Sequence, residues 1–408
     1  MYEVLKGMRV VECASFIAAP SCCLHLLQLG AEVVRIDPVG GGPDFHRWPI
    51  SAAGHSLYWE GLNKGKKSVA IDLGSPAGRE LATALITAPD SNAGLFVTNF
   101  PASGFLAHDR LVAKRADLIT VRVMGWNDGG PAVDYTVNAA VGVPGMTGSA
   151  RNGDEPVNHV LPAWDLLAGA YAAFVLLAAE RQRRDTGRGQ EVRVPLSDLA
   201  IASLGHLGQI AEVLQGGGRP RMGNALYGAF GRDFCTRDGA RLMIVAITAR
   251  HWSGLVESLN LSREVAALEA ELGVSFKTIE GSRFEHRDRL FPLVEAAVAR
   301  LSVAEAGALF DKNGVCWSQY RTLRQALTED PRLSPDNPLF APLDQPSGLR
   351  YPAPGAAATF EERQRLPLTR APHLGEHSDE ILAAWLGLSA GEIGRLHDQG
   401  LIAGPSGK

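Results

Sequence analysis

The length, composition and charge of the chain limit what it can be. Its 408 residues, 46% of them hydrophobic, exceed what one ordinary core holds, so we expect two domains. The formal net charge of −4 supplies no broad basic face, and nucleic acid is therefore not an expected partner. The five cysteines are odd in number and include no C-x-x-C pair. This pattern argues against a zinc site and a disulfide framework, and it favours a reducing cytoplasm.

Neither a signal peptide nor a membrane span is expected. The N-terminal residues MYEVLKGMRVVE contain no uninterrupted apolar stretch of the kind that a signal peptide needs. The longest apolar run, 166–179, is shorter than the ~20 residues of a membrane-spanning helix. We therefore expect a cytoplasmic protein with no membrane partner, in which this run forms a buried helix.

Strand-like and helix-like runs alternate along the first 125 residues. Apolar, β-branched runs predict strands at 8–13, 31–37, 68–73, 94–100 and 118–124, and helices are expected at 19–29 and 77–87. The second of these helices has a capping serine, Ser75, followed by Pro76 at its first position. Strands that alternate with helices predict a doubly wound, mostly parallel sheet.

The second half of the chain is less regular. A long helix is expected from Pro162 to about 184, followed by a strand at 191–194. Asp238-Gly239 is typical of a hairpin turn, and helices are expected to dominate 251–312. From about 331 the sequence is rich in proline and loops, and it closes with helices at 378–386 and 390–397 and a disordered tail at 404–408.

The β-α-β opening suggests a dinucleotide fold, but the fingerprint is missing. Pyrophosphate binding needs glycines in the first turn, and that turn, ASFIAAPS, has none. The glycines at 40–42 follow the second strand instead. NAD is therefore not an expected cofactor, and we interpret Asp37 as a strand-end carboxylate that caps a turn.

One acidic residue opens the long apolar helix. In the segment HVLPAWDLLAG, Pro162 is expected at the first helical position, which places Asp165 in the first turn. The partial positive charge of the helix N-terminus favours an anionic carboxylate there, and such a carboxylate can act as a nucleophile toward an acyl group. On position alone, simple complementation of the helix dipole is the commoner role.

An ordered set of segments carries a family resemblance. These are GMRVVECASFIAAPSCCLHLLQLGAEVVRIDP, LNKGKKSVAIDL, TNF, DYTVNAAVG, the helix of Asp165, TGRGQEVRVPLSD and APHLGEHSDEIL. Together they resemble the class III (CaiB/BaiF-type) CoA-transferases over nearly the full length. The resemblance implies an acyl-CoA enzyme with Asp165 as its catalytic nucleophile.

The resemblance also implies a fold. It is an α/β fold in which a Rossmann-like large domain is built from both chain ends, with a smaller inserted α+β domain, and two chains form an interlocked homodimer. We expect the large domain at 1–200, a linker at 201–225, the small domain at 226–325, and a return to the large domain at 326–408.

The positions of the CoA contacts follow from the resemblance, and the candidates for the substrate carboxylate follow from its charge. CoA is expected against the large domain, near Ala18, Ile71, Asn99 and Phe100. Lys64, Lys66 and Lys67 are cations for its phosphates, or else they form a solvated strand edge. The free carboxylate of the substrate needs cationic or amide partners, for which the candidates are Arg47 and Arg232, with Asn138 and His159 as polar neighbours. No metal or cofactor is expected beyond the CoA moiety of the substrate.

Three departures narrow the activity within the family. Val133 stands where the racemases have a general-base histidine, so proton abstraction lacks its base. Ile17 replaces a glutamine of the formyl-CoA transferases, and RMGNALYGAFGRDF replaces their longer glycine-rich insertion.

Stretches such as DPVGGGPDFHRWP and GRLHDQGLIAGP resemble members that move CoA between the two carboxyls of one C5 diacid. An intermolecular transferase acting on another diacid pair and a silent acyl-CoA-binding protein are the alternatives.

Overall fold

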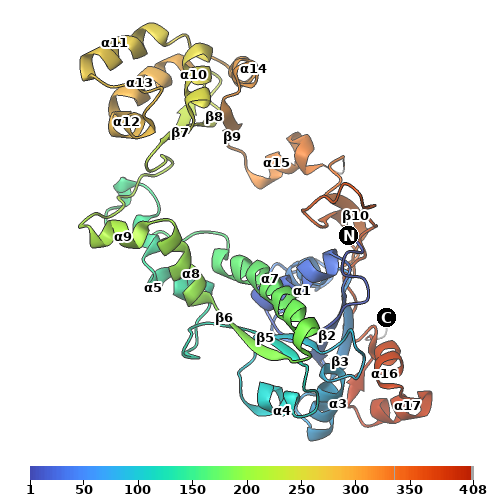
Figure 1. Cartoon of the computed structure of the whole chain (residues 1–408). Coiled ribbons are helices and arrows are strands. Elements are labelled where there is room, and N and C mark those ends of the chain that lie inside the picture. Colours follow the sequence, from blue (N-terminus) through green and yellow to red (C-terminus); the bar gives the residue numbers. More distant parts are fainter. Residues whose placement is uncertain (335, 406–408) are drawn as a thin grey trace. The chain divides into compact units, whose positions relative to one another are not determined.

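The computed structural model describes residues 1–334 and 336–405, so only the first part of the predicted disordered tail is described. The chain divides into two compact units. The large unit comprises Met1–Val141, Val160–Gly208 and Pro331–Lys408, and the small unit comprises Gly142–His159 and Gln209–Asp330. Both chain ends belong to the large unit (Figure 1). The division differs from the predicted one, because 142–159 groups with the small unit and the predicted linker carries helical structure.

A seven-stranded sheet forms the centre of the large unit, in the order β12-β3-β2-β1-β4-β5-β6. Its neighbouring strands are parallel except for β12, which pairs antiparallel with β3 at one edge. The strands are β1 (Arg9–Cys13), β2 (Glu32–Pro38), β3 (Lys67–Ile71), β4 (Leu95–Thr98), β5 (Ile119–Met124), β6 (Gln190–Pro195) and β12 (Ile402–Ala403). This confirms the α/β class. The order 3-2-1-4-5-6 is that of Rossmann-type sheets, whose ligands bind where the order reverses, here between β1 and β4.

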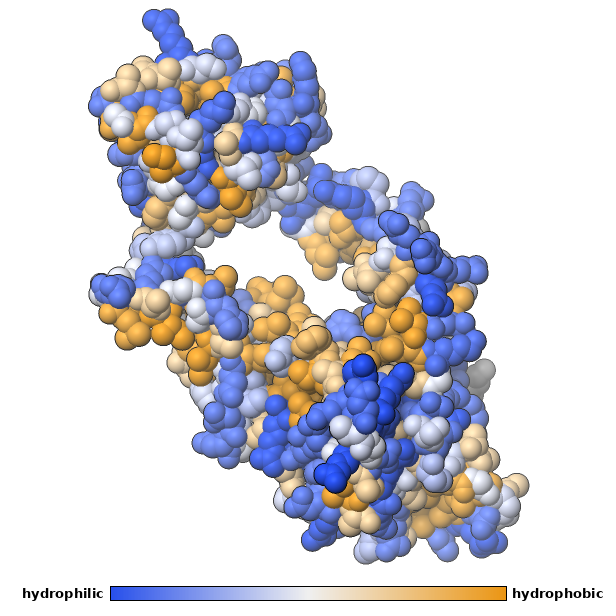
Figure 2. All heavy atoms as spheres, in the orientation of Figure 1, coloured by the Kyte–Doolittle hydropathy of each residue, from blue (hydrophilic) through white to orange (hydrophobic). Residues whose placement is uncertain are grey.

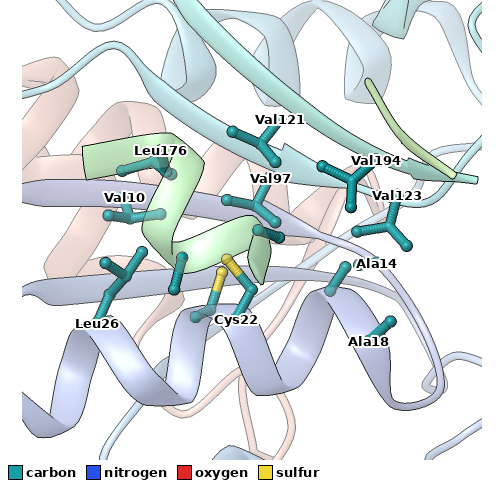
Figure 3. Close-up of a cluster of buried hydrophobic side chains, with 14 of the residues drawn as sticks. Val10, Ala14, Ala18, Cys22, Leu26, Val97, Val121, Val123, Leu176 and Val194 are labelled. Atoms are coloured by element: carbon teal, nitrogen blue, oxygen red, sulfur yellow. The ribbon is translucent and has the colours of Figure 1, made fainter. Parts of the chain in front are cut away.

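Helices cover both faces of this sheet, which explains why its inner strands β1, β2, β4 and β5 are buried almost throughout. Helices α1 (Ala18–Gln28) and α7 (Ala163–Thr186) pack on one face, where Val10, Val97 and Val121 meet Cys22 and Leu176 (Figure 3). On the other face are α3 (Pro76–Ile86), α16 (Ser378–Leu386) and α17 (Ala390–Asp398). All of these helices lie within a few residues of their predicted ranges.

The contact between α1 and α7 depends on a glycine. A Cβ atom at Gly169 would lie 1.9 Å from Oγ of Ser21 and 2.8 Å from the carbonyl oxygen of Ala18. The two helix backbones therefore approach closely where α1 begins, next to the first turn of α7. This approach brings the Asp165 turn beside the β1–α1 connection.

Helix α7 is buried on one face only, so the prediction of a buried helix was wrong for the other face. Leu166, Leu167, Tyr171 and Phe174 are exposed, Phe174 by 64%. Figure 2 shows apolar surface over the region that α7 occupies in Figure 1. By length and composition alone this helix could cross a membrane, but its buried residues form part of the core described above.

A buried ionic cluster connects the inner strands β1 and β2 to the segments that follow β2. Arg35 donates to Glu12 at 2.7 Å, to Asp37 at 2.8 Å and to Asp44 at 2.9 Å, and Lys66 donates to Glu12 at 2.7 Å. All five side chains are almost completely buried. Asp37, which also accepts from the Ser68 hydroxyl at 3.2 Å, therefore serves this cluster and is not a turn cap.

The remaining elements of the large unit connect and flank the sheet. They are the helices α2 (Leu57–Asn63), α4 (His108–Val112), α5 (Asp134–Ala140) and α8 (Leu196–His206), the short helices Gly104–Leu106 and Pro331–Leu333, and the hairpin of β10 (Phe340–Asp344) and β11 (Arg350–Pro354). The hairpin falls in the stretch predicted to be rich in loops.

The small unit has its own antiparallel sheet and core. The sheet consists of β7 (Phe230–Cys235), β8 (Arg241–Ala246) and β9 (Cys316–Gln319). The predicted turn at Asp238-Gly239 joins β7 to β8 and is confirmed. The helices are α6 (Val143–Met146), α9 (Gln209–Leu214), α10 (Ala249–Ser258), α11 (Ser262–Leu272), α12 (Glu280–Glu285), α13 (Arg287–Val298), α14 (Val303–Asn313) and α15 (Leu323–Glu329), with a short helix at Ala150–Asn152.

Candidate active site

A cavity of about 500 Å³ opens at the carboxyl ends of the parallel strands. Its lining comes from the β1–α1 connection, the segment before α2, the end of β5, and the starts of α5 and α7. Asp165 and Arg47 both line it, as do Ala18 and Asn99. The structure thus brings four of the predicted site residues into one cavity, at the edge where the sheet order places ligands.

Asp165 is the third residue of α7 and is held through its backbone. Helix α7 begins after Pro162, which supplies no capping side chain. Oδ2 of Asp134, at the start of α5, accepts the N–H of Trp164 at 2.6 Å and that of Asp165 at 3.1 Å. Asp134 therefore satisfies N–H groups that the first turn of a helix leaves without partners.

The electrostatic environment of Asp165 differs from the expected one. Burial, followed by the negative charge of Asp134, raises the pKa of Asp165 to about 7, and Arg47 opposes this shift. We expected the helix N-terminus to keep this carboxylate anionic, but desolvation and a like charge outweigh the helix dipole. The site holds a carboxyl group that ionises near neutral pH.

Arg47 lies over two aromatic rings of the cavity. Its guanidinium carbon is 5.4 Å from the ring centroid of Phe16 and 5.3 Å from that of Tyr58, and both rings line the cavity. Phe16 has a φ of 69°, a left-handed conformation that is unusual for a bulky residue and is typical of functional sites. This stacking holds a cation in the cavity of Asp165, and binding of the substrate carboxylate by Arg47 stays a prediction.

Among the expected CoA contacts, Asn99 has a defined role in the cavity. Its side chain accepts from the backbone N–H of Ser15 at 3.1 Å and donates to the Ser15 carbonyl at 2.8 Å, which fixes the β1–α1 turn. Ile71 is fully buried within the sheet core, and Phe100 packs beside that core without lining the cavity. A contact of CoA with either side chain stays a prediction.

The three lysines expected near the CoA phosphates already have partners within the chain. Lys66 is buried and bound to Glu12 and Asn63. Lys67 pairs with Glu32 at 2.8 Å and with Glu380 at 2.6 Å. Lys64 is buried and donates to the Gly61 carbonyl, and burial, together with the charge of Lys66, lowers its pKa to about 8. The solvated edge is therefore wrong for Lys66, which is buried, and phosphate binding by the three lysines stays a prediction.

The other substrate candidates are not among the lining residues of the cavity. Asn138 is fully buried and accepts from the Trp164 indole at 3.1 Å, so it braces the start of α7 and does not line the cavity. Arg232 belongs to the small unit, where it pairs with Glu295 at 2.8 Å and lies over the Phe234 and Phe291 rings. His159 also belongs to the small unit. Substrate binding by Arg232 or His159 stays a prediction.

Sequence reasoning missed Asp134, Tyr58 and Phe16 as members of this site. Within the described residues, the Tyr58 hydroxyl is buried without a hydrogen-bond partner, and burial raises its pKa, so it stays protonated. No local pattern marks Tyr58, because α2 follows an irregular segment. Asp134 had a signal in the segment DYTVNAAVG, but its function depends on a helix that begins about 30 residues later.

The comparisons with known proteins show the family of the chain. A family model described as CoA-transferase family III matches residues 5–378. The chain is 51% identical over 407 residues to the 2-methylfumaryl-CoA isomerase of Chloroflexus aurantiacus, covering 99% of each chain. It is 27% identical to the succinyl-CoA–D-citramalate CoA-transferase of the same organism, covering 98% of each. It is 26% identical to the succinyl-CoA:mesaconate CoA-transferase of Haloarcula marismortui, covering 93% of this chain and 95% of that one.

A solved structure supports the fold. The crystal structure of a CAIB/BAIF family protein from Brucella suis matches with a TM-score of 0.74 at 24% identity, covering 94% of this chain and 99% of that one. The resemblance read from the sequence segments is confirmed by the family match over most of the chain and by a full-length relative at 51% identity. The chain therefore belongs to CoA-transferase family III.

Proposed function

We propose that the protein moves CoA between the two carboxyl groups of 2-methylfumarate (mesaconate) within one substrate molecule. The observation that carries this proposal is the 51% identity, over the full chain, to a 2-methylfumaryl-CoA isomerase. A cavity of about 500 Å³ around Asp165 supports it, because pockets of this size enclose small organic substrates. The proposed reaction uses no metal or redox cofactor, and CoA enters as part of the substrate.

The proposed mechanism has four acyl transfers. The Asp165 carboxylate attacks the C1 thioester, which gives a mixed anhydride and CoA thiolate. The thiolate attacks the aspartyl carbonyl, forms an aspartyl-CoA thioester and releases mesaconate into the cavity. The C4 carboxylate of mesaconate attacks this thioester and again releases the thiolate, which then attacks the C4 carbonyl. This last step regenerates the Asp165 carboxylate, so atoms and charges balance over the cycle.

The cavity residues have distinct parts in this cycle. Arg47 would bind the carboxylate that is not reacting, because a buried carboxylate needs a charged partner. The Tyr58 ring lines the cavity and lies against the Arg47 guanidinium, so it would hold this cation in place for the substrate. Retention of mesaconate beside the thioester replaces a second bimolecular encounter with a local one, which contributes up to ~7–11 kcal/mol in favourable systems.

Transfer to a second, free acid is the alternative function. Relatives at 26–27% identity are named as transferases between succinyl-CoA and another acid. Val133 and Ile17 both line the cavity, and neither side chain can exchange a proton or form a hydrogen bond. The apolar lining favours an enclosed substrate over repeated exchange of free acids.

Isotope-labelled free mesaconate distinguishes the two functions. We expect mesaconyl-C1-CoA to become mesaconyl-C4-CoA, with the regioisomer assigned by NMR, and little label to enter the product because the acid stays enclosed. Succinate, itaconate and formate, added separately, should accept CoA poorly. Rapid label incorporation, or succinyl-CoA forming at a comparable rate, would establish the intermolecular alternative.

The proposal includes a cytoplasmic, interlocked homodimer, as expected from the family resemblance. The free cysteines, of which Cys13, Cys22 and Cys23 are buried, suit a reducing compartment. The exposed apolar face of α7 supports a partner chain, because monomeric proteins rarely expose contiguous apolar surface of this kind.

Subunit exchange tests the interlocked arrangement. The protein should sediment at twice the 43.5 kDa of one chain. Native tagged and untagged dimers should not exchange chains when mixed, because linked chains must unfold before they separate. Refolding the two forms together should give mixed dimers.

Phe174→Glu on the exposed face of α7 should disrupt assembly. Val4→Glu, at an exposed apolar residue outside α7, should not. A native species with the mass of one chain would contradict the dimer.

A further inference from the structure

The N-terminus of helix α7 is capped by a side chain from another helix. Pro162 at its N-cap has no side chain that can accept a hydrogen bond. One oxygen of Asp134 accepts the N–H groups of Trp164 and Asp165, at 2.6 and 3.1 Å. Asp134 is 1% exposed and stands at the first position of α5. The nucleophile is therefore tied, through its own backbone N–H, to a second buried carboxylate.

Trp164 is held a second time by the same helix. Its indole N–H donates to Oδ1 of Asn138 at 3.1 Å, and Asn138 follows Asp134 by one turn of α5. Two side chains of α5 thus fix the backbone and the side chain of the residue just before Asp165. The direction in which Asp165 enters the cavity is set by α5 and not by α7 alone.

We propose that Asp134 is a positioning residue for the nucleophile: its carboxylate caps the first turn of α7, and its negative charge opposes that of Asp165. The catalytic meaning of this inference rests on the proposed function, but the placement and ionisation of Asp165 do not. A carboxylate whose negative charge is opposed by a neighbour is more basic, and a more basic anion is the stronger nucleophile once it forms.

The charged and titratable groups that face Asp165 within the large unit act in opposite directions. Asp134 raises the pKa of Asp165 in addition to burial, and Arg47 lowers it. Burial and, to a smaller extent, the charge of Asp165 raise the pKa of Tyr58, which Arg47 lowers, so Tyr58 stays protonated. Tyr135, which also lines the cavity, donates its hydroxyl to the Val160 carbonyl at 3.0 Å. Asp134 thus acts on Asp165 in two ways: it accepts a hydrogen bond from the backbone N–H of Asp165, and its charge raises the pKa of the Asp165 side chain.

Two substitutions at one position separate the cap from the charge. Asp134→Asn keeps an oxygen that accepts the N–H groups but removes the charge. We expect the acid limb of kcat/KM for mesaconyl-C1-CoA to move to lower pH by about one unit or more, with turnover at pH 8 within about tenfold of wild type. Asp134→Ala removes both contributions, so kcat should fall at every pH. Arg47→Gln should move the acid limb to higher pH. Asp238→Asn is the control, because Asp238 caps α14 at Val303 in the small unit. This substitution should leave the acid limb in place.

Infrared spectroscopy provides a readout that does not need turnover. The absorption band of the protonated Asp165 carboxyl group is the band that is missing in Asp165→Asn. With rising pH, this band should disappear at lower pH in Asp134→Asn than in wild type. An unchanged titration in Asp134→Asn would overturn the role of its charge. Equal kcat of Asp134→Ala and Asp134→Asn across the pH range would overturn the role of the cap. If wild type fails to isomerise mesaconyl-CoA while the infrared shift occurs, the proposed function fails and the inference on Asp134 stands.

Discussion

Replacement of Asp165 by asparagine should abolish CoA transfer, with kcat reduced by at least ~1000-fold. The substitution preserves the size and polarity of the side chain but removes the carboxylate that must form the anhydride. Binding of CoA should be largely unchanged, because Asp165 is expected to meet only the reacting thiol end of CoA. Steady-state turnover, with the product regioisomer assigned by NMR, and calorimetric titration with CoA measure the two effects. More than a few per cent of wild-type turnover would contradict the assignment, and Asp165→Ala excludes recovery by deamidation.

Chemical trapping identifies the same residue independently. Hydroxylamine or borohydride added to wild type during turnover should modify the peptide that carries Asp165, because the cycle passes through an activated aspartyl ester. The modification should require substrate and should be absent in Asp165→Asn. Modification confined to another carboxylate would show that Asp165 is not the nucleophile.

The stability of Asp165→Asn shows whether its inactivity reflects misfolding. Burial and Asp134 raise the pKa of Asp165 from 3.8 to about 7, so the folded state holds a proton that the unfolded chain has released. Wild type therefore loses stability as pH rises from about 4 to 7, and a neutral asparagine avoids this loss. Asp165→Asn should be more stable than wild type above pH 7, by roughly 2–4 kcal/mol, with a smaller difference near pH 4. A variant less stable than wild type at pH 8 would contradict this environment.

The parts of the fold that sequence reasoning predicted are those fixed by local patterns. Strands such as Ile119–Met124 are buried on both sides and therefore appear as apolar runs, and Ser75-Pro76 marks the start of its helix with a cap and a proline. The exposed side of α7 could not be recognised, because Phe174 and Leu176 look alike in sequence although one is exposed and the other is buried. The apolar character of a residue does not show whether its side chain is buried in the core or exposed on a surface that could bind another chain.

The candidate site was predictable in part, because the family pattern marks Asp165 and the charge of the substrate suggested Arg47. Asp165 and Arg47 were identified and share a cavity. Lys66 was misjudged because lysines beside a glycine look like solvated cations, whereas its partner Glu12 lies 54 positions away in sequence. The pKa of Asp165 was misjudged because the helix dipole is visible in sequence, but the opposing carboxylate of Asp134 and the desolvation are tertiary effects.

The buried cluster around Arg35 carries the largest expected effect on stability. Arg35→Met would leave the carboxylates of Glu12, Asp37 and Asp44 buried without their shared cation. Removal of one partner from a buried ionic group costs about 3–5 kcal/mol, because the remaining charges stay desolvated. Urea unfolding should therefore show a loss of this size, without a matching change in the m-value. The exposed pair of Arg350 and Asp344 provides the control, and Arg350→Met should cost less than about 1 kcal/mol.

The same cluster reaches the active site through Asp44. Arg35 holds Asp44 with two bonds, at 2.9 and 3.1 Å, and Asp44 lies three residues before Arg47, whose backbone N–H donates to the Asp44 carbonyl at 3.3 Å. Asp44→Asn keeps one acceptor and weakens this anchor, so we expect a higher KM with a smaller loss of stability than in Arg35→Met. Combination of Arg35→Met with Asp44→Asn should cost less than the sum of the two single effects, because the second substitution removes one of the stranded charges. A loss below 1 kcal/mol for Arg35→Met, or strict additivity in the double variant, would show that the cluster does not act as a unit.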